Sequence, residues 1–187
     1  MGPQGPAGAA GAPGGTRAAG PCFDNVNRYV DCGNGTVTDT VTGLIWLKDG
    51  GCIAQTTWAD ASTAVANLKA GDCSLADMGA LADGSSPGDW RLPTKAEWEA
   101  TIARAVALGC INGIAPSLTN DQGTNCMFSG TGTRSFLNAR YQAYWSSTVN
   151  DQFPDQAWAG FTNQAGVVAY TARIGNLAVW PVRSAYR

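Results

Sequence analysis

The sequence predicts an α+β domain that follows a short collagen-like segment. Three observations lead to this prediction. Glycine recurs at every third position over residues 2–16, two stretches carry helix caps followed by an apolar stripe, and several short runs are typical of strands. With 187 residues, of which 14% are charged, the chain is long enough for one full core. We therefore divide it into a stalk end and hinge, residues 1–20, and one globular head, residues 21–187.

Residues 2–16 form five Gly-X-Y triplets, with proline at X in two of them and at Y in one. Only glycine fits at the crowded axis of a collagen triple helix, so the pattern predicts that three chains wind together. A flexible linker rich in Gly, Ala and Pro is the alternative, and five triplets in phase favour collagen. The phase breaks at residues 17–20, which we interpret as a hinge. We therefore expect a homotrimer, held by this segment and by the head.

Six cysteines and no histidine restrict the chemistry of the chain. The cysteine spacing fits no zinc site, so we expect disulfides and an oxidising compartment. Six cysteines allow fifteen pairings, of which we favour the sequential one. It would join Cys22 to Cys32, Cys52 to Cys73, and Cys110 to Cys126.

The sequence contains no apolar run of about 20 residues and no apolar signal segment near its start, so we predict no membrane span. Together with the cysteines, this leads us to expect an extracellular or bacterial cell-surface location for a processed chain. A phage particle is the alternative location.

The first half of the head reads as strands followed by a helix. Residues 22–23 and 29–32 would form a small hairpin closed by its two cysteines. Residues 36–39 alternate as a strand, and residues 44–47 form an apolar strand that we expect to be buried on both faces. After a cysteine-bearing loop, Thr57 would cap a helix over residues 58–69. Its predicted apolar face consists of Ala61, Ala64, Val65 and Leu68.

A strand-to-helix corner over residues 88–99 is the clearest local signal. Pro93 disfavours helical geometry at the preceding residue, so the helix cannot begin earlier. Thr94 is then a good N-cap, and Glu97 stands three residues further on, which predicts a capping box. The helix would run from residue 95 to about 108, with an apolar stripe at Trp98, Ile102 and Val106.

The second half combines a polar loop with short strands. Residues 109–140 carry several Asn and Gly residues, and Cys110 and Cys126 would clip this long loop down. Strands are then expected over residues 144–148, 156–161, 167–171 and 177–183. Pro181 marks an edge or a strand end in the last of them, since proline donates no hydrogen bond to a ladder.

Six motifs fall in the order found in a known bacterial domain family. They are Gly35-Thr36-Val37-Thr38-Asp39, Thr42-Gly43-Leu44-Ile45-Trp46, Trp90-Arg91-Leu92-Pro93-Thr94, Glu97-Trp98, Tyr144-Trp145-Ser146-Ser147-Thr148 and Pro181-Val182-Arg183. Over about residues 32–183 the chain resembles the C-terminal domain of the Legionella collagen-like adhesin. The resemblance implies a C-type-lectin-like fold, similar to that of formylglycine-generating enzymes, with two helices and small antiparallel sheets. It also implies a trimeric adhesin that attaches to glycosaminoglycans and cells.

The function that we predict is a trimeric surface adhesin whose head binds an extracellular ligand, a glycan, with an anionic glycan as one candidate. Binding residues commonly lie on loops held by a rigid scaffold. The candidate segments are the polar loop 112–140 and the turns 150–155 and 162–166. Forked arginine donors would grip carboxylate or sulfate groups, and aromatic rings would stack on sugar faces. The candidate ligand-binding residues are Arg134, Arg140, Tyr141, Phe153, Trp158 and Arg173.

Other functions remain open at this point. The head could be a structural trimerisation knob, or a subunit of a filament or phage fibre, without a ligand of its own. A calcium ion among Asn120, Asp121 and Asn125 is a further alternative, although such clusters usually form turns. We predict no enzyme and no catalytic residue, because without histidine only carboxylates remain and Glu97 is assigned to a cap. No cofactor, metal site or nucleic-acid partner is predicted.

Overall fold

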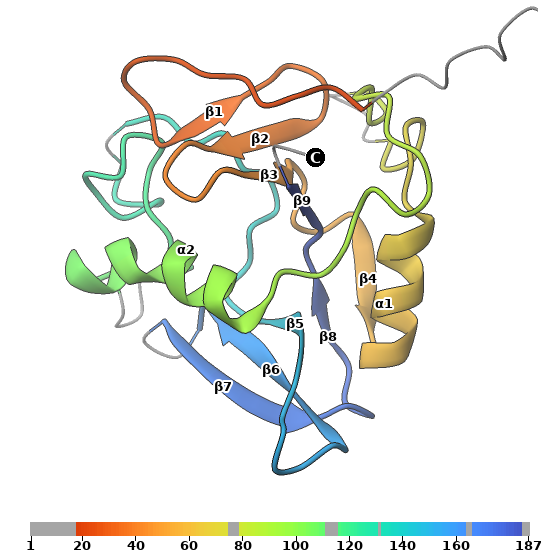
Figure 1. Cartoon of the computed structure of the whole chain (residues 1–187). Coiled ribbons are helices and arrows are strands. Elements are labelled where there is room, and N and C mark those ends of the chain that lie inside the picture. The colour runs from red at the N-terminus through yellow and green to blue at the C-terminus, as the bar shows by residue number, and fades with distance from the viewer. Residues whose placement is uncertain (1–17, 75–78, 111–115, 131, 164–165, 185–187) are drawn as a thin grey trace, which may run out of the picture.

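The computed structural model describes residues 18–74, 79–110, 116–130, 132–163 and 166–184. Within these residues, two helices and nine strands form an α+β head whose strands make two mainly antiparallel sheets (Figure 1). The α+β prediction is therefore confirmed. The Gly-X-Y triplets at residues 2–16 lie outside the described residues.

The first sheet has the strand order β1-β2-β3-β9 and is antiparallel throughout. Its strands are β1 (Tyr29–Asp31), β2 (Thr36–Asp39), β3 (Leu44–Leu47) and β9 (Val182–Ser184). Every residue of β2 and β3 is buried, as predicted for residues 44–47. The two central strands of this sheet are therefore covered on both faces.

The predicted hairpin between residues 22–23 and 29–32 is wrong. The strand β1 pairs with β2 instead, and Tyr29 lies opposite Asp39. The turn between them contains two glycines with φ of 70° and 87°, a left-handed conformation that a tight hairpin turn requires. Cys22 lies beside β2, where its N–H donates to Thr38 Oγ1 at 3.0 Å.

Three disulfides join the cysteines in sequential pairs, which is the pairing that we favoured from the sequence: Cys22–Cys32, Cys52–Cys73 and Cys110–Cys126. Their Cα–Cα distances of 5.4–5.5 Å are ordinary for disulfides. Each bridge fastens a segment that has little regular structure to the rest of the head.

The second sheet has the order β4-β8-β5-β6-β7, in which only β5 and β8 run parallel. Its strands are β4 (Ile53–Thr56), β5 (Ala143–Val149), β6 (Gln156–Phe161), β7 (Val167–Ala172) and β8 (Leu177–Val179). Two predictions need correction. The strand β4 lies in the expected loop, and the single strand expected over 177–183 is divided into β8 and β9.

Trp180 and Pro181 separate these last two strands. Because proline has no N–H, it ends the pairing of β8 and lets the chain cross from the second sheet to the first. Pro181 thus marks a strand end, one of the two roles predicted for it.

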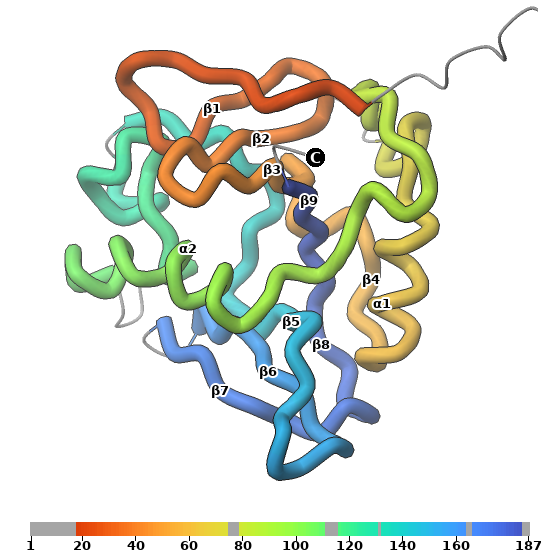
Figure 2. Tube along the Cα trace, viewed as in Figure 1, coloured from red at the N-terminus to blue at the C-terminus, as the bar shows by residue number. Residues whose placement is uncertain are grey.

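Both helices begin at the predicted caps. In α1 (Trp58–Asn67) the Thr57 side chain accepts a hydrogen bond from the Asp60 N–H, and the helix ends two residues before the predicted Lys69. In α2 (Lys95–Ala107) the capping box between Thr94 and Glu97 is complete. The helix α2 lies next to β6 and β7 in both Figures 1 and 2, and packs on them.

Aromatic rings fill the space between the sheets and α2. Trp46, Trp98 and Trp180 are at most 1% exposed, and their ring centroids lie 5.3–6.4 Å apart in edge-to-face pairs. Trp98 Nε1 donates to the Trp145 carbonyl at 3.1 Å, so its polar atom is satisfied. Val106, predicted to continue the apolar stripe of α2, is 39% exposed.

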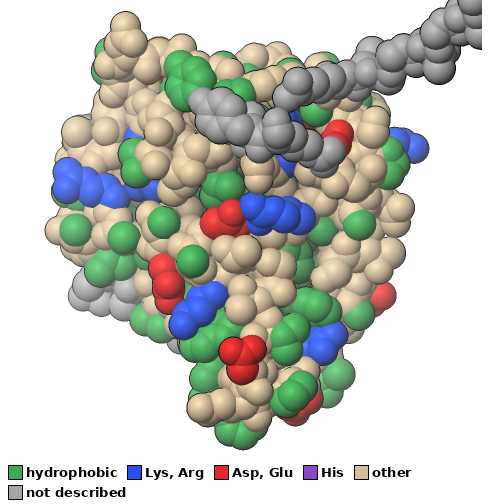
Figure 3. Space-filling model, viewed as in Figure 1, with side chains coloured by type: hydrophobic (Ala, Val, Ile, Leu, Met, Phe, Trp, Pro, Cys, Tyr) green, Lys and Arg blue, Asp and Glu red, His purple; other side chains and the backbone are tan. Residues whose placement is uncertain are grey.

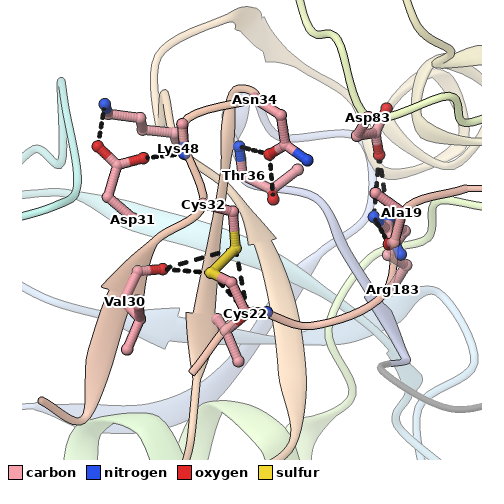
Figure 4. The surroundings of a disulfide bond; sticks show 12 residues. Ala19, Cys22, Val30, Asp31, Cys32, Asn34, Thr36, Lys48, Asp83 and Arg183 are labelled. Carbon is pink, nitrogen blue, oxygen red and sulfur yellow. Dashed lines mark hydrogen bonds and ion pairs between the residues drawn. A yellow bond between two sulfur atoms is a disulfide. The ribbon is translucent and has the colours of Figure 1, made fainter. Parts of the chain in front are cut away.

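Residues 18–22 are docked on the head beside the first disulfide (Figure 4). Arg183 and Asp83 form a buried ion pair at 3.1 Å. Arg183 Nη2 also donates to the Ala19 carbonyl at 2.6 Å, and the Ala19 N–H donates to the Asp83 carbonyl at 2.6 Å. The backbone of Ala19 thereby completes a buried polar network.

Candidate functional site

The end of the second sheet carries a cluster of partly exposed aromatic rings, which we call the aromatic face: Phe153, Trp158 and Tyr170. Trp158 on β6 and Tyr170 on β7 are cross-strand partners, so their side chains emerge on the same side of the sheet. Their ring centroids lie 5.3 Å apart at an interplanar angle of 89°. Phe153, in the turn before β6, has its centroid 6.2 Å from that of Tyr170, with the two rings tilted by only 35°.

Two cations flank the aromatic face, and each is held against an indole ring. Lys95, the first residue of α2, places its Nζ atom 3.8 Å from the centroid of Trp158. The Arg173 guanidinium lies 4.0 Å from the ring of Trp58, and Nη1 donates to the Pro154 carbonyl at 3.1 Å. Such cation–π contacts fix long side chains that would otherwise move freely in water.

Figure 3 shows hydrophobic side chains gathered at the lower end of the molecule, the end that β6 and β7 occupy in Figure 1, with charged side chains of both signs among them. Phe153 and Tyr170 are each 47% exposed. Asp151 and Asp155, in the same turn as Phe153, are exposed as well. Apolar rings grouped on a surface and rimmed by charges are typical of an interaction site.

Three of the six predicted ligand-binding residues meet here: Phe153 and Trp158 belong to the aromatic face, and Arg173 flanks it. Trp158 is half-buried, so only part of its side chain is open to a ligand. Tyr170 was missed by the sequence analysis. Tyr170 comes to this site because it pairs with Trp158 across strands β6 and β7. The sequence does not fix the register of these two strands, so it does not reveal this pairing.

The other three predicted residues lie in the long loop before β5, on other surfaces. The Arg134 guanidinium lies 4.7 Å from the ring centroid of the exposed Phe128. Arg140 lines an open hollow of about 210 Å³ together with Gln55 and Gln142, whose amides are hydrogen-bonded at 2.8 Å. Tyr141 is 46% exposed. No described contact joins these residues to the aromatic face.

The cluster considered for calcium is engaged by protein donors. Asn120 Oδ1 accepts hydrogen bonds from the N–H groups of Thr124 and Asn125, at 2.9 and 3.2 Å. The Asp121 carboxylate accepts from the Ser135 N–H and hydroxyl. Asn120 and Asp121 therefore use their side-chain oxygens to stabilise turns of the loop. Over the described ranges, no group of three or more Cys, Asp or Glu residues is placed to hold a metal ion.

The carboxylate of Glu97 serves the corner before α2. Burial alone would raise the pKa of Glu97. Hydrogen bonds from Arg91 and from the Thr94 N–H, together with the Arg91 charge, outweigh burial and lower the pKa. The lowered pKa keeps the carboxylate of Glu97 ionised, and the ionised carboxylate accepts hydrogen bonds at the start of α2, which is the capping role that the sequence predicted.

Comparison with known proteins adds one family to this geometry. The family model described as the Lcl C-terminal domain matches residues 35–183. The match begins at the first residue of the Gly35–Asp39 motif and ends at the last residue of the Pro181–Arg183 motif, so it includes all six motifs of the sequence analysis. No curated protein matches the chain. None of the described helices is long and apolar enough to cross a membrane.

Proposed function

Because the chain belongs to the Lcl C-terminal domain family, we propose that its head is the binding domain of a collagen-like surface adhesin and that its ligand is an extracellular glycan. The family match, which covers most of the head, is the observation that carries the proposal. The three disulfides suit a protein outside the reducing cytoplasm. The proposed fold of the head is C-type-lectin-like.

The proposal includes a homotrimer. The Gly-X-Y triplets at residues 2–16 would wind with those of two further chains and bring three heads together. A weak site repeated three times on one particle binds a glycan-covered surface much more tightly than a single site does. The role proposed is therefore attachment without catalysis.

Two surfaces are candidates for the glycan. Arg134 and Arg140 carry exposed guanidinium groups that suit sulfate or carboxylate, whereas the aromatic face offers stacking rings. An anionic ligand held by the arginines would bind more weakly as salt is added, because exposed charges are screened. An Arg134→Ala/Arg140→Ala variant would then lose affinity for anionic glycans and keep the affinity for neutral ones.

A glycan array probed with the oxidised full-length protein tests the proposal. The matched sample is a variant that lacks residues 2–16 and keeps Ala19, whose backbone docks on the head. We expect trimers of the full chain to bind glycans, and the shortened variant to bind the same glycans with lower avidity. Trimers that bind no glycan and no cell would instead support the structural alternative, a trimerisation knob or fibre subunit.

A further inference from the structure

We propose that the aromatic face binds neutral pyranose units of a glycan, and that Phe153 and Tyr170 are the rings on which the sugars stack. This inference rests on the proposed function and deepens it, because it names the chemical class of the ligand at one surface. Four observations carry it: the geometry of the two exposed rings, their rigid support, the signs of the surrounding charges, and the engagement of the nearby cations.

The geometry of the exposed rings suits a flat apolar ligand. The ring centroids of Phe153 and Tyr170 lie 6.2 Å apart, the ring planes are inclined by 35°, and each residue is 47% exposed, so two aromatic rings lie close together at the surface. A pyranose ring carries weakly positive C–H groups on its apolar face, and the face of an aromatic ring carries negative charge density. Two such surfaces can accept two sugar units of one oligosaccharide.

Neighbouring side chains and backbone hydrogen bonds hold the rings in place. Trp158 meets Tyr170 edge-on at 5.3 Å, and Lys95 covers Trp158 at 3.8 Å. The turn that carries Phe153 is tied to β6, because the Gln156 N–H donates to the Phe153 carbonyl at 2.9 Å. The Arg173 N–H ties the same turn to the end of β7 by donating to the Asp155 carbonyl at 2.9 Å. A platform that is already fixed pays little entropy when a ligand binds.

The charges around the rings favour a neutral ligand. Asp151 and Asp155 are exposed in the same turn as Phe153, and a sulfated or carboxylated sugar on this face would meet their negative charge. Carboxylates accept hydrogen bonds from sugar hydroxyl groups, which every neutral pyranose offers.

The nearby cations are already engaged. Lys95 contacts Trp158 and pairs with Glu99 at 3.6 Å. Arg173 stacks on Trp58 and donates to Pro154. Each cation is therefore already partly satisfied within the protein, which weakens its attraction for an anion. The aromatic face is thus chemically distinct from the surfaces that carry Arg134 and Arg140.

The test measures glycan binding by the oxidised full-length protein. The probes are neutral and sulfated oligosaccharides of hexoses, N-acetylhexosamines and deoxyhexoses on an array, followed by calorimetry with the strongest neutral binder. The variants are Phe153→Ala, Tyr170→Ala and Tyr170→Phe. The control is Phe23→Ala, which removes an aromatic ring that is 59% exposed on the N-terminal segment.

We expect neutral oligosaccharides to bind the wild type and the Phe23→Ala control equally, with a Kd that changes little between about 50 and 500 mM NaCl. Each alanine variant at the aromatic face should weaken this binding about tenfold, whereas Tyr170→Phe, which keeps the ring, should retain it. An unchanged melting temperature shows that the variants are folded.

Three results would overturn the inference. Phe153→Ala and Tyr170→Ala could both bind neutral glycans as the wild type does. The protein could bind only sulfated glycans in a salt-dependent way, in which case the proposed adhesin function survives without this site. Tyr170→Ala could lower the native mass, which would make the face a contact between copies of this chain. Binding to no glycan of any kind would overturn the proposed function as well.

Discussion

Arg91 and Glu97 are joined by two parallel hydrogen bonds, from Nη1 to Oε2 at 2.7 Å and from Nη2 to Oε1 at 2.6 Å. Glu97 Oε2 also accepts the Thr94 N–H at 2.7 Å. Arg91 belongs to the segment before α2, and its N–H and carbonyl pair with those of Val182. One carboxylate thus connects the start of α2 to the segment that borders the first sheet.

Replacing Glu97 with Gln should lower the melting temperature at neutral pH and flatten the acid dependence of stability. Gln can still form the capping box but carries no charge for Arg91. Because the pKa of Glu97 is lowered in the folded protein, its contribution is present at neutral pH and is lost as the pH falls below the ordinary value of 4.5. Thermal denaturation between pH 7 and about pH 3 measures both effects.

The control for this prediction is Glu99→Gln. Glu99 is 52% exposed at its side chain and pairs with Lys95 at 3.6 Å, so its loss should change stability little at any pH. Equal acid sensitivity in the wild type and in Glu97→Gln would show that other carboxylates govern acid unfolding.

Arg183→Met should destabilise the head by about 3–5 kcal/mol, because it leaves the Asp83 carboxylate buried without its cation. The substitution also removes the donor to the Ala19 carbonyl. Lys48→Met is the matched control, since Lys48 pairs with Asp31 near the surface and its loss should cost less than about 1 kcal/mol. Urea unfolding curves compare the two, and similar costs would contradict the role of burial.

Gly160→Ala should destabilise the head although glycine and alanine differ by one methyl group. A Cβ atom at residue 160 would lie 2.5 Å from Cδ2 of Trp98, a buried ring at the centre of the core. Such overpacking costs about 1–3 kcal/mol or more. Gly20→Ala, where a Cβ meets nothing within 4 Å, is the control. Unchanged stability would contradict this prediction, and a changed near-ultraviolet spectrum would then show that Trp98 has moved aside.

Removing the third disulfide with Cys110→Ala and Cys126→Ala should cost about 3 kcal/mol, because the bridge closes a loop of sequence separation 16. Over residues 116–125 this loop contains no helix or strand, and hydrogen bonds such as those of Asn120 and Asp121 hold it besides the bridge. Denaturant unfolding of the variant and of the oxidised wild type measures the difference. A loss below about 1 kcal/mol would mean that the hydrogen bonds of the loop hold it without the bridge.

The parts of the fold that the sequence reveals are those set by local chemistry. Thr57 and Thr94 begin the helices because their side chains satisfy helix N–H groups within three residues, which a sequence shows directly. The β3 strand is recognisable because Leu44, Ile45, Trp46 and Leu47 form an uninterrupted apolar run. These features need no knowledge of distant residues.

The parts that the sequence does not reveal depend on distant partners. The strand β4 consists of Ile53-Ala54-Gln55-Thr56, a run without clear alternation, and it becomes a strand by pairing with β8 more than a hundred residues later. Tyr170 reaches the candidate site through its register with Trp158. Arg134, Arg140 and Tyr141 lie between α2 and β5, in the segment where the sequence placed a polar loop, and no described contact joins them to the aromatic face.

The docking of Ala19 determines where mechanical load enters the head. Tension on the chain before residue 18 meets first the hydrogen bonds between Ala19 and the Arg183–Asp83 pair, and then Cys22. The covalent bridge from Cys22 to Cys32 carries that tension past the intervening residues directly to the end of β1. In the proposed adhesin, shear on an attached cell would therefore pull on the first sheet, and the exposed residues 23–26 would not unravel first.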